Sequence, residues 1–274
     1  MLAKRFSNTR VVRLEGGLGS QIIGFLEFLY LEKFTSMETF IDSHYFQESS
    51  LDGWDPRVSK WPWALSRYGI HLKDLKEFSG GFATKRLLSS VRTQDRALKY
   101  SWQQLASTFR ERFPIEDEKV EKFANAIGLD LKEKYAVVHI RRGDYVQVAS
   151  LLLDESDQIT LVKQLGALLP SKVLVISDTV ITNEVKQKFK VGSTQEFIFI
   201  DDANVDAGLL HDLMRLAKLV VASNSTFSFT AGILNETDAL VLSPLNFAKR
   251  EPTSSPDSLF RSSGDFFIHR PSKL

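Results

Sequence analysis

Short apolar runs and amphipathic stretches alternate through the second half of the chain. Apolar runs rich in β-branched residues predict buried strands at 135–140, 172–176, 197–200, 219–222 and 239–242. Between them, apolar side chains at helical spacing predict helices at 156–169, 183–190, 207–218 and 227–234. Because strands alternate with helices and each strand ends in polar residues, the pattern is typical of a parallel sheet with helices on both faces.

The beginning of the chain shows the same alternation once. Residues 9–14 are β-branched and alternate, residues 18–34 carry apolar side chains at helical spacing, and residues 39–42 form another short apolar run. This order of strand, turn, helix and strand is the first half of a doubly wound unit. Between 47 and 102 the periodicity weakens. All four tryptophans lie in that part of the chain, and for them we favour core packing over a sugar-binding platform.

Together these patterns predict an α/β protein with two Rossmann-like lobes and a cleft between them. A charged, helical stretch at 113–134 is expected to carry the chain from one lobe to the other. We therefore expect an N-terminal lobe over 1–130 and a C-terminal lobe over 131–274. The tail after Leu245 is rich in Ser, Pro and Arg, and we expect it to cross back over the first lobe.

Composition narrows the class of protein. With 274 residues, of which 43% are hydrophobic and 25% charged, the chain has the composition of an ordinary soluble globular protein. A net charge of +1 provides no global attraction to nucleic acid, and the absence of cysteine excludes disulfides and thiolate metal sites. No apolar stretch has the length of a signal-peptide core or of a transmembrane segment. We therefore expect a cytoplasmic protein, for which any contact with a membrane would be peripheral and at the inner face. Composition leaves the oligomeric state open.

The predicted strand 135–140 ends abruptly in two arginines, a glycine and an aspartate. Ligands of open α/β sheets bind at such strand ends, and two guanidinium groups there favour a phosphate. His139 and Arg141 are two residues apart, so they should point to the same face and reach one ligand, whereas Arg142 should point elsewhere and be structural. Asp144 is either a catalytic base or the carboxylate that orients Arg141. The alternative to a ligand site is a salt-bridged loop.

Two further turns connect a predicted strand to a predicted helix. Residues 16–19 are Gly-Gly-Leu-Gly, which would let a ligand approach the backbone, but they match neither a P-loop nor a complete dinucleotide-binding motif. A tight turn without a ligand is an equal alternative. Residues 223–228 offer hydroxyl and backbone N–H groups that suit a phosphate, and simple N-capping is the alternative there.

Metal and nucleophile motifs are missing from the sequence. It contains no Asp-x-Asp, no His, Asp or Glu set at metal-ligand spacing, and no Gly-x-Ser-x-Gly. A bound diphosphate is therefore expected to be neutralised by arginine and backbone N–H groups rather than by a divalent cation.

Four motifs, in order along the chain, resemble one enzyme family. Residues 16–21 (GGLGSQ) resemble the signature GGLGNQ, and residues 40–45 (FIDSHY) resemble the strand that follows it. Residues 139–145 (HIRRGDY) match the pattern HxRRGDY, and residues 212–229 resemble a region that contains DLxLM and NSSFSWW. Together they resemble the bacterial α-1,2-fucosyltransferases of glycosyltransferase family 11.

This resemblance implies two Rossmann-like lobes of the GT-B type and an enzyme without metal or other cofactor. It implies transfer of L-fucose from GDP-L-fucose to a hydroxyl of a galactose-containing glycan, with inversion at the anomeric carbon, in surface-polysaccharide synthesis. By position, Arg141 would hold the β-phosphate with support from His139. Further donor contacts are expected from Gly17, Gly19, Ser20, Asp178, Asn224, Ser225, Thr226 and Phe227.

The sequence also departs from the family pattern. Ser20 stands where the family has Asn, and residues 229–230 stand where it has two tryptophans. These departures leave open a different linkage or GDP-sugar on the same scaffold, or a nucleotide-sugar binding protein with little catalytic activity. The general base is open as well, because Glu15 and Asp42 are alternatives to Asp144.

Overall fold

A computed structural model of the chain describes residues 9–46, 61–78, 102–147, 153–202, 204–237, 239–244 and 266–269. The chain divides into two units between Pro114 and Ile115, earlier than the boundary near residue 130 that we expected. The helix α5 (Asp117–Ala126) accounts for the difference, since Val120 and Ala124 on this helix pack in the core of the second unit.

The first unit begins with the predicted strand, helix and strand. Strands β1 (Thr9–Arg13) and β2 (Glu38–Asp42) pair in parallel, and α2 (Leu18–Phe34) connects them. The crossing of helix and strand is close, because a Cβ on Gly24 would lie 2.6 Å from Cδ2 of Leu14. Within its described residues, the other helical elements of this unit are η1 (His44–Phe46), η2 (Leu65–Tyr68), η3 (Leu72–Asp74), α4 (Trp102–Phe109) and η5 (Arg110–Arg112).

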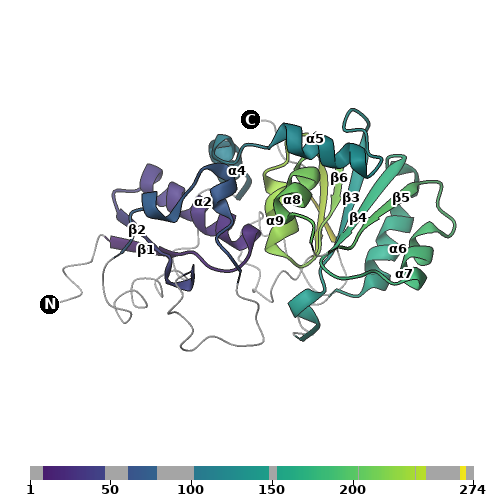
Figure 1. Cartoon of the computed structure of the whole chain (residues 1–274), viewed down its shortest axis with the longest axis horizontal. Coiled ribbons are helices and arrows are strands. Elements are labelled where there is room, and N and C mark those ends of the chain that lie inside the picture. Colours follow the sequence, from purple (N-terminus) through teal and green to yellow (C-terminus); the bar gives the residue numbers. More distant parts are fainter. Residues whose placement is uncertain are drawn as a thin grey trace. The chain divides into compact units, whose positions relative to one another are not determined.

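The second unit is built on one sheet, with strand order β5-β4-β3-β6-β7-β8 (Figure 1). All neighbours are parallel except β7 and β8. The sheet starts at β3 in its middle, adds β4 and β5 on one side, and then adds β6 and β7 on the other side. The bounds are β3 Tyr135–Ile140, β4 Lys172–Ser177, β5 Glu196–Ile200, β6 Leu219–Val221, β7 Leu240–Pro244 and β8 Phe266–His269.

The alternation of side chains along β3 explains how both faces of this sheet are covered. Val137 packs with α5 and α8, whereas Val138 packs with α6 and α7. Every residue of β3 is buried, as expected of a central strand between two helical layers. The remaining helices are α6 (Glu155–Leu165), α7 (Asn183–Lys190), α8 (Ala207–Leu216), α9 (Thr226–Ile233), η6 (Gly143–Gln147) and η7 (Gly166–Leu168).

The predicted α/β class with parallel sheets is confirmed, with two local corrections. The helix expected at 113–134 is only ten residues long, and the chain turns at Gly128, whose φ is +77°. The tail was expected to cross over the first lobe, but β8 pairs antiparallel with β7 and so belongs to the sheet of the second unit. In the described part of the chain, no helix has the length and apolar character needed to cross a membrane.

Candidate functional site

The strand order of the second unit creates a switch point between β3 and β6. The chain leaves β3 toward β4 on one side and returns to β6 on the other, and ligands of open α/β sheets bind beside the carboxyl ends of such strands. His139 and Arg141 lie at the end of β3, and residues 223–226 follow β6. The fold therefore brings together two of the three turns that the sequence indicated.

His139 is buried at this point and is held on three sides. Its Nδ1 lies 2.8 Å from the Ser223 hydroxyl, and its ring centroid lies 5.4 Å from that of Phe227. Its backbone oxygen accepts a hydrogen bond from the Gln158 side chain at 2.7 Å. Burial, followed by the nearby Arg141 charge, lowers the pKa of His139 to about 3. The imidazole is therefore neutral at physiological pH.

Arg141 is held by a carboxylate from the neighbouring strand end. Its Nη1 lies 2.5 Å from Oδ2 of Asp178, which follows β4 directly. The guanidinium also stacks over the Tyr145 ring, 5.0 Å from its centroid. Asp144 was an alternative partner, but its side chain lies outside the described part of the chain. Among the described side chains, Asp178 makes an ion pair that can orient Arg141.

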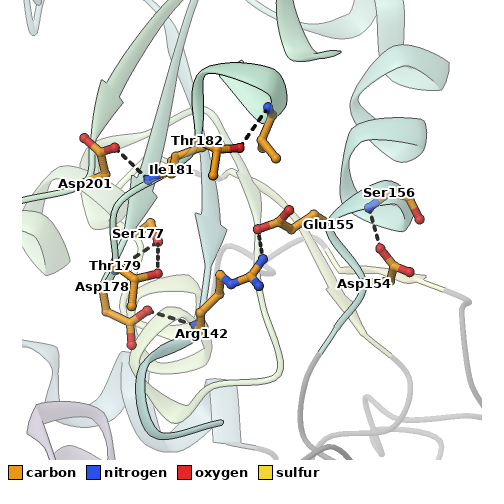
Figure 2. Close-up of polar contacts among 11 residues, drawn as sticks. Arg142, Asp154, Glu155, Ser156, Ser177, Asp178, Thr179, Ile181, Thr182 and Asp201 are labelled. Carbon is orange, nitrogen blue, oxygen red and sulfur yellow. Dashed lines mark hydrogen bonds and ion pairs between the residues drawn. The ribbon is translucent and has the colours of Figure 1, made fainter. Parts of the chain in front are cut away.

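Arg142 is directed away from Arg141, as the alternation predicted. Its guanidinium pairs with Glu155, the first residue of α6, while its backbone N–H donates to Oδ1 of Asp178 at 2.8 Å (Figure 2). The Arg142 side chain therefore links the loop after β3 to the start of α6.

Gly143 makes room for the Asp178 carboxylate. A Cβ at this position would lie 2.3 Å from Oδ2 of Asp178, closer than any real Cβ contact, and the φ of Gly143 is +21°. The glycine in the Arg-Arg-Gly-Asp sequence is therefore required by packing of the loop against the end of β4. This requirement is a structural reason for the motif, independent of any ligand.

The turn between β6 and α9 is ordered mainly by its own hydroxyl groups. Ser225 caps α9 by accepting a hydrogen bond from the Phe227 N–H at 3.3 Å, so the N-capping alternative applies to this residue. The Ser228 hydroxyl accepts from the Ser223 N–H at 3.2 Å. Asn224 and Ser225 are buried, whereas Thr226 and Phe227 are half-buried.

The glycine loop belongs to the first unit and is fixed by a buried glutamine. Gln21 donates to the backbone oxygens of Gly16 and Pro62 at 2.8 and 2.9 Å, and accepts from the Ala64 N–H at 2.8 Å. Gly17 is the N-cap of α2 and has no side-chain cap. A Cβ on Gly17 would meet the Trp61 ring at 3.4 Å. These contacts of Gln21 fix the loop that contains Gly19 and Ser20.

Glu15 and Asp42, the alternatives to Asp144 as general base, differ in their exposure and their contacts. Glu15 is half-exposed and forms an ion pair with Arg13 at 2.9 Å. Asp42 is buried and accepts a hydrogen bond from the His44 N–H at 3.2 Å. Within the described ranges, no group of three or more His, Cys, Asp or Glu residues could hold a metal ion.

The tryptophans that the structure describes take part in packing. The Trp63 indole N–H donates to the Ile70 oxygen at 2.9 Å, and its ring meets Phe46 edge-on at 5.1 Å. Trp54 and the side chain of Trp102 lie outside the described residues.

Sequence reasoning singled out Asp178 as a donor contact and Ser223 as part of the turn before α9, but it did not predict that Asp178 pairs with Arg141 and Ser223 with His139. The pairing of Asp178 with Arg141 can be predicted only when the order of the strands in the sheet is known. Ile140 pairs in register with Ser177, so the residues that follow these two strands become neighbours.

Comparison with known families decides where the chain belongs. The pattern that describes Glycosyl transferase family 11 matches residues 94–263, more than half of the chain, including the loop after β3 and the turn before α9. The chain belongs to glycosyl transferase family 11. It is therefore a member of a family of glycosyltransferases, as the motifs had predicted.

Solved structures give weaker similarities. Two of them are "Crystal structure of POFUT1 in complex with GDP", at 16% identity and TM-score 0.46, and "Crystal structure of POFUT1 in complex with GDP-fucose", at 15% and 0.43. They cover 84% and 85% of this chain, and 95% of each POFUT1 chain is covered. A glycosyl transferase family 9 structure from Veillonella parvula DSM 2008 has 14% identity and TM-score 0.45, covering 86% of this chain and 80% of its own. Comparison with curated proteins found no match.

Proposed function

We propose that this glycosyltransferase transfers L-fucose from GDP-L-fucose to a hydroxyl of a galactose-containing glycan in surface-polysaccharide synthesis. The proposed linkage is α-1,2, and the proposed reaction inverts the anomeric carbon without a metal ion. The observation that carries this proposal is Arg141, fixed at the switch point of the sheet beside the neutral His139. The absence of cysteine is compatible with a reducing compartment, and we place the reaction in the cytoplasm, at or near the inner membrane face.

In this proposal Arg141 stabilises charge that appears during the reaction. The acceptor hydroxyl attacks C1 of fucose while the bond from C1 to the β-phosphate oxygen breaks. Negative charge then builds on the GDP that leaves, and a guanidinium placed beside the β-phosphate lowers the energy of the transition state more than that of the bound substrate. Because the cation is held in place before the reaction, little energy is spent on its reorientation.

His139 supports the diphosphate by hydrogen bonding rather than by charge. Its low pKa keeps the ring neutral, and the Ser223 hydroxyl lies beside Nδ1. With that hydroxyl donating to Nδ1, the ring proton is on Nε2, which is then a donor for an anionic oxygen. We assign this donor role to Nε2 of His139.

The remaining donor contacts follow the start of α9 and the glycine loop. We propose that Asn224, Ser225, Thr226 and Phe227 contribute backbone N–H and hydroxyl groups to the diphosphate, where the helix start favours negative charge. In this proposal, Gly17, Gly19 and Ser20 of the glycine loop also contact the donor. The first unit is the proposed acceptor side.

We propose Asp144 as the general base. Two roles are open for a carboxylate beside this loop, orienting Arg141 and accepting a proton, and Asp178 forms an ion pair with Arg141 that can serve the first. Asp144 lies in the same loop, three residues after Arg141. A carboxylate there would accept the proton of the attacking hydroxyl.

Thermal unfolding with different nucleotides tests the donor assignment. We expect GDP to raise the unfolding temperature, whereas UDP and NAD at the same concentration should have little effect. At a hundred times its dissociation constant, a ligand adds about 2.7 kcal/mol of stability, which is several degrees for a chain of this size. A protein that GDP does not stabilise would contradict both the fucosyltransferase and the GDP-sugar binding alternative.

A further inference from the structure

The Asp178 carboxylate is held by a backbone hydrogen bond that is independent of its ion pair with Arg141. Asp178 follows β4 directly, and its Oδ1 accepts the Arg142 N–H at 2.8 Å. Ile140 and Ser177 pair in register, so the strand ends that carry Arg141 and Asp178 are adjacent. The carboxylate is therefore a fixed anion at the carboxyl edge of the sheet (Figure 2).

The other oxygen of Asp178 holds Arg141. Oδ2 lies 2.5 Å from Nη1 of Arg141, and the contact is a short ion pair that is not aligned as a hydrogen bond. Gly143 leaves the space in which this oxygen lies, and the Tyr145 ring lies against the guanidinium. The Arg141 and Asp178 side chains are 14% and 22% exposed, so an incoming ligand can reach the pair while solvent screens it only partly.

We propose that Asp178 is the positioning residue for Arg141 rather than a contact of the nucleotide. This inference rests on the proposed function, since it assigns the work of Arg141 to the diphosphate of a nucleotide sugar. Asp178 holds the guanidinium in one orientation before the donor binds, and shares it with the diphosphate afterwards. Holding a long, flexible side chain in place removes an entropy cost from the reaction.

A fixed carboxylate beside Arg141 should have opposite effects on binding and on turnover. It repels the incoming diphosphate and offsets part of the arginine charge, so it weakens donor binding. It also keeps Arg141 aimed at the leaving group, so it favours the chemical step. A residue that contacts the nucleotide directly would instead strengthen binding.

The adjacent strand contains a matched control. Asp201, at the end of β5, also accepts a backbone N–H, from Ile181 at 2.7 Å, and also pairs with a cation, Lys186 at 2.9 Å. Its side chain is 18% exposed, similar to that of Asp178. Figure 2 shows Asp201 bonded to Ile181, while Asp178 is bonded to Arg142. Each carboxylate thus follows a strand, accepts one backbone N–H and pairs with one cation, although Asp201 makes both contacts through Oδ2 whereas Asp178 divides them between its two oxygens.

Steady-state kinetics with GDP-fucose and calorimetry with GDP test the inference. In Asp178→Asn, which keeps the shape and the backbone acceptor, kcat should fall at least about tenfold while GDP binds as tightly as in the wild type or more tightly. Asp201→Asn should have the kcat and the GDP affinity of the wild type. A GDP affinity lowered about tenfold or more in Asp178→Asn, or an unchanged kcat, would overturn the positioning role.

A second pair of variants shows whether Asp178 acts through Arg141. Arg141→Lys retains a cation without the planar fork, and adding Asp178→Asn to it should lower kcat less than about threefold further. If the two substitutions together instead lower kcat by the product of their separate effects, the inference would be overturned. If wild-type enzyme transfers fucose and these variants behave otherwise than expected, only the positioning role fails. If the wild type neither binds GDP nor transfers fucose, the proposed function itself is contradicted.

The wild-type protein provides a measurement that does not depend on a variant folding. Crystal structures with and without GDP should both retain the bond from the Arg142 N–H to Asp178, and GDP should add a contact between Arg141 and the phosphate. A complex in which the Asp178 carboxylate binds the ribose or the base would overturn the inference.

Discussion

Burial of His139 determines how this side chain can meet an anion. A protonated imidazole would attract a phosphate more strongly, but burial, with a smaller contribution from the Arg141 charge, lowers the pKa of His139 to about 3. The positive charge of the site is thus carried by Arg141, and His139 contributes a directed hydrogen bond. Because only Arg141 is charged, the site does not have to bury two adjacent cations.

The same burial predicts that stability depends on pH through His139. In the unfolded chain a histidine has a pKa near 6.5, so between about pH 6.5 and 3 the unfolded state binds the extra proton. Stability should therefore fall as the pH is lowered, by up to about 1.4 kcal/mol per pH unit below 6.5 and by roughly 2 kcal/mol at pH 5. Urea unfolding at pH 7 and pH 5 measures the difference.

His139→Asn separates this contribution from those of the carboxylates. The asparagine side chain cannot take up a proton, so the loss between pH 7 and pH 5 should be smaller by about the same roughly 2 kcal/mol, whatever the stability at pH 7. An identical loss in wild type and variant would show that His139 is not a neutral buried histidine.

At the scale of elements, the first unit depends on a close crossing between a helix and a strand. Gly24 lies in the middle of α2, and a Cβ there would meet Cδ2 of Leu14 at 2.6 Å and the Arg13 backbone oxygen at 3.4 Å. Leu14 is fully buried, so its side chain has little room to move. The helix can approach β1 because position 24 has no side chain.

Gly24→Ala should therefore destabilise the protein although alanine favours helices. Helix propensity alone would gain about 1 kcal/mol, whereas an overpacked core costs typically 1–3 kcal/mol. We expect the overpacking to dominate and the unfolding temperature to fall, as calorimetry can measure. In a Leu14→Val background the cost should be smaller, because valine lacks the methyl group that the new Cβ meets. An equal cost in both backgrounds would exclude this contact as the cause.

The pattern of apolar and polar residues predicted most strands and helices because it reflects which side chains are buried. Strands β3, β4 and β5 and helix α7 lie within one residue of their predicted bounds, since each has a continuous apolar run or a clear helical stripe. The strand β8 was not predicted, because four residues far along a polar tail show no periodicity, and their pairing with β7 is long-range. Helix α5 was predicted too long, because charged residues continue beyond the turn at Gly128.

The residues that form the candidate site could be predicted from the sequence, but the residues that hold them in place could not. The strand end identified His139 and Arg141, and the alternation separated Arg141 from Arg142 correctly. The contacts with Asp178 and Ser223 join residues far apart in the sequence, and they follow from the order of strands β4, β3 and β6. A local pattern does not contain that order, so neither contact could be predicted.

On the scale of the whole molecule, two units have separate tasks in the proposed function. The second unit contains the switch point, the neutral histidine and the positioned arginine, all on elements of one buried sheet. The first unit presents a glycine loop supported by Gln21. A division of this kind lets the donor side stay constant while the acceptor side determines which glycan is modified.

Transfer of fucose from GDP-fucose to lactose tests the central claim most directly. The wild type should form a fucosylated trisaccharide, with an α-1,2 linkage on galactose by NMR. Arg141→Ala should lose transfer, by well over about tenfold, because the charge on the leaving GDP loses its fixed partner. Absence of product from the wild type with lactose and other galactosides, or an Arg141→Ala activity within about tenfold of the wild type, would contradict the account.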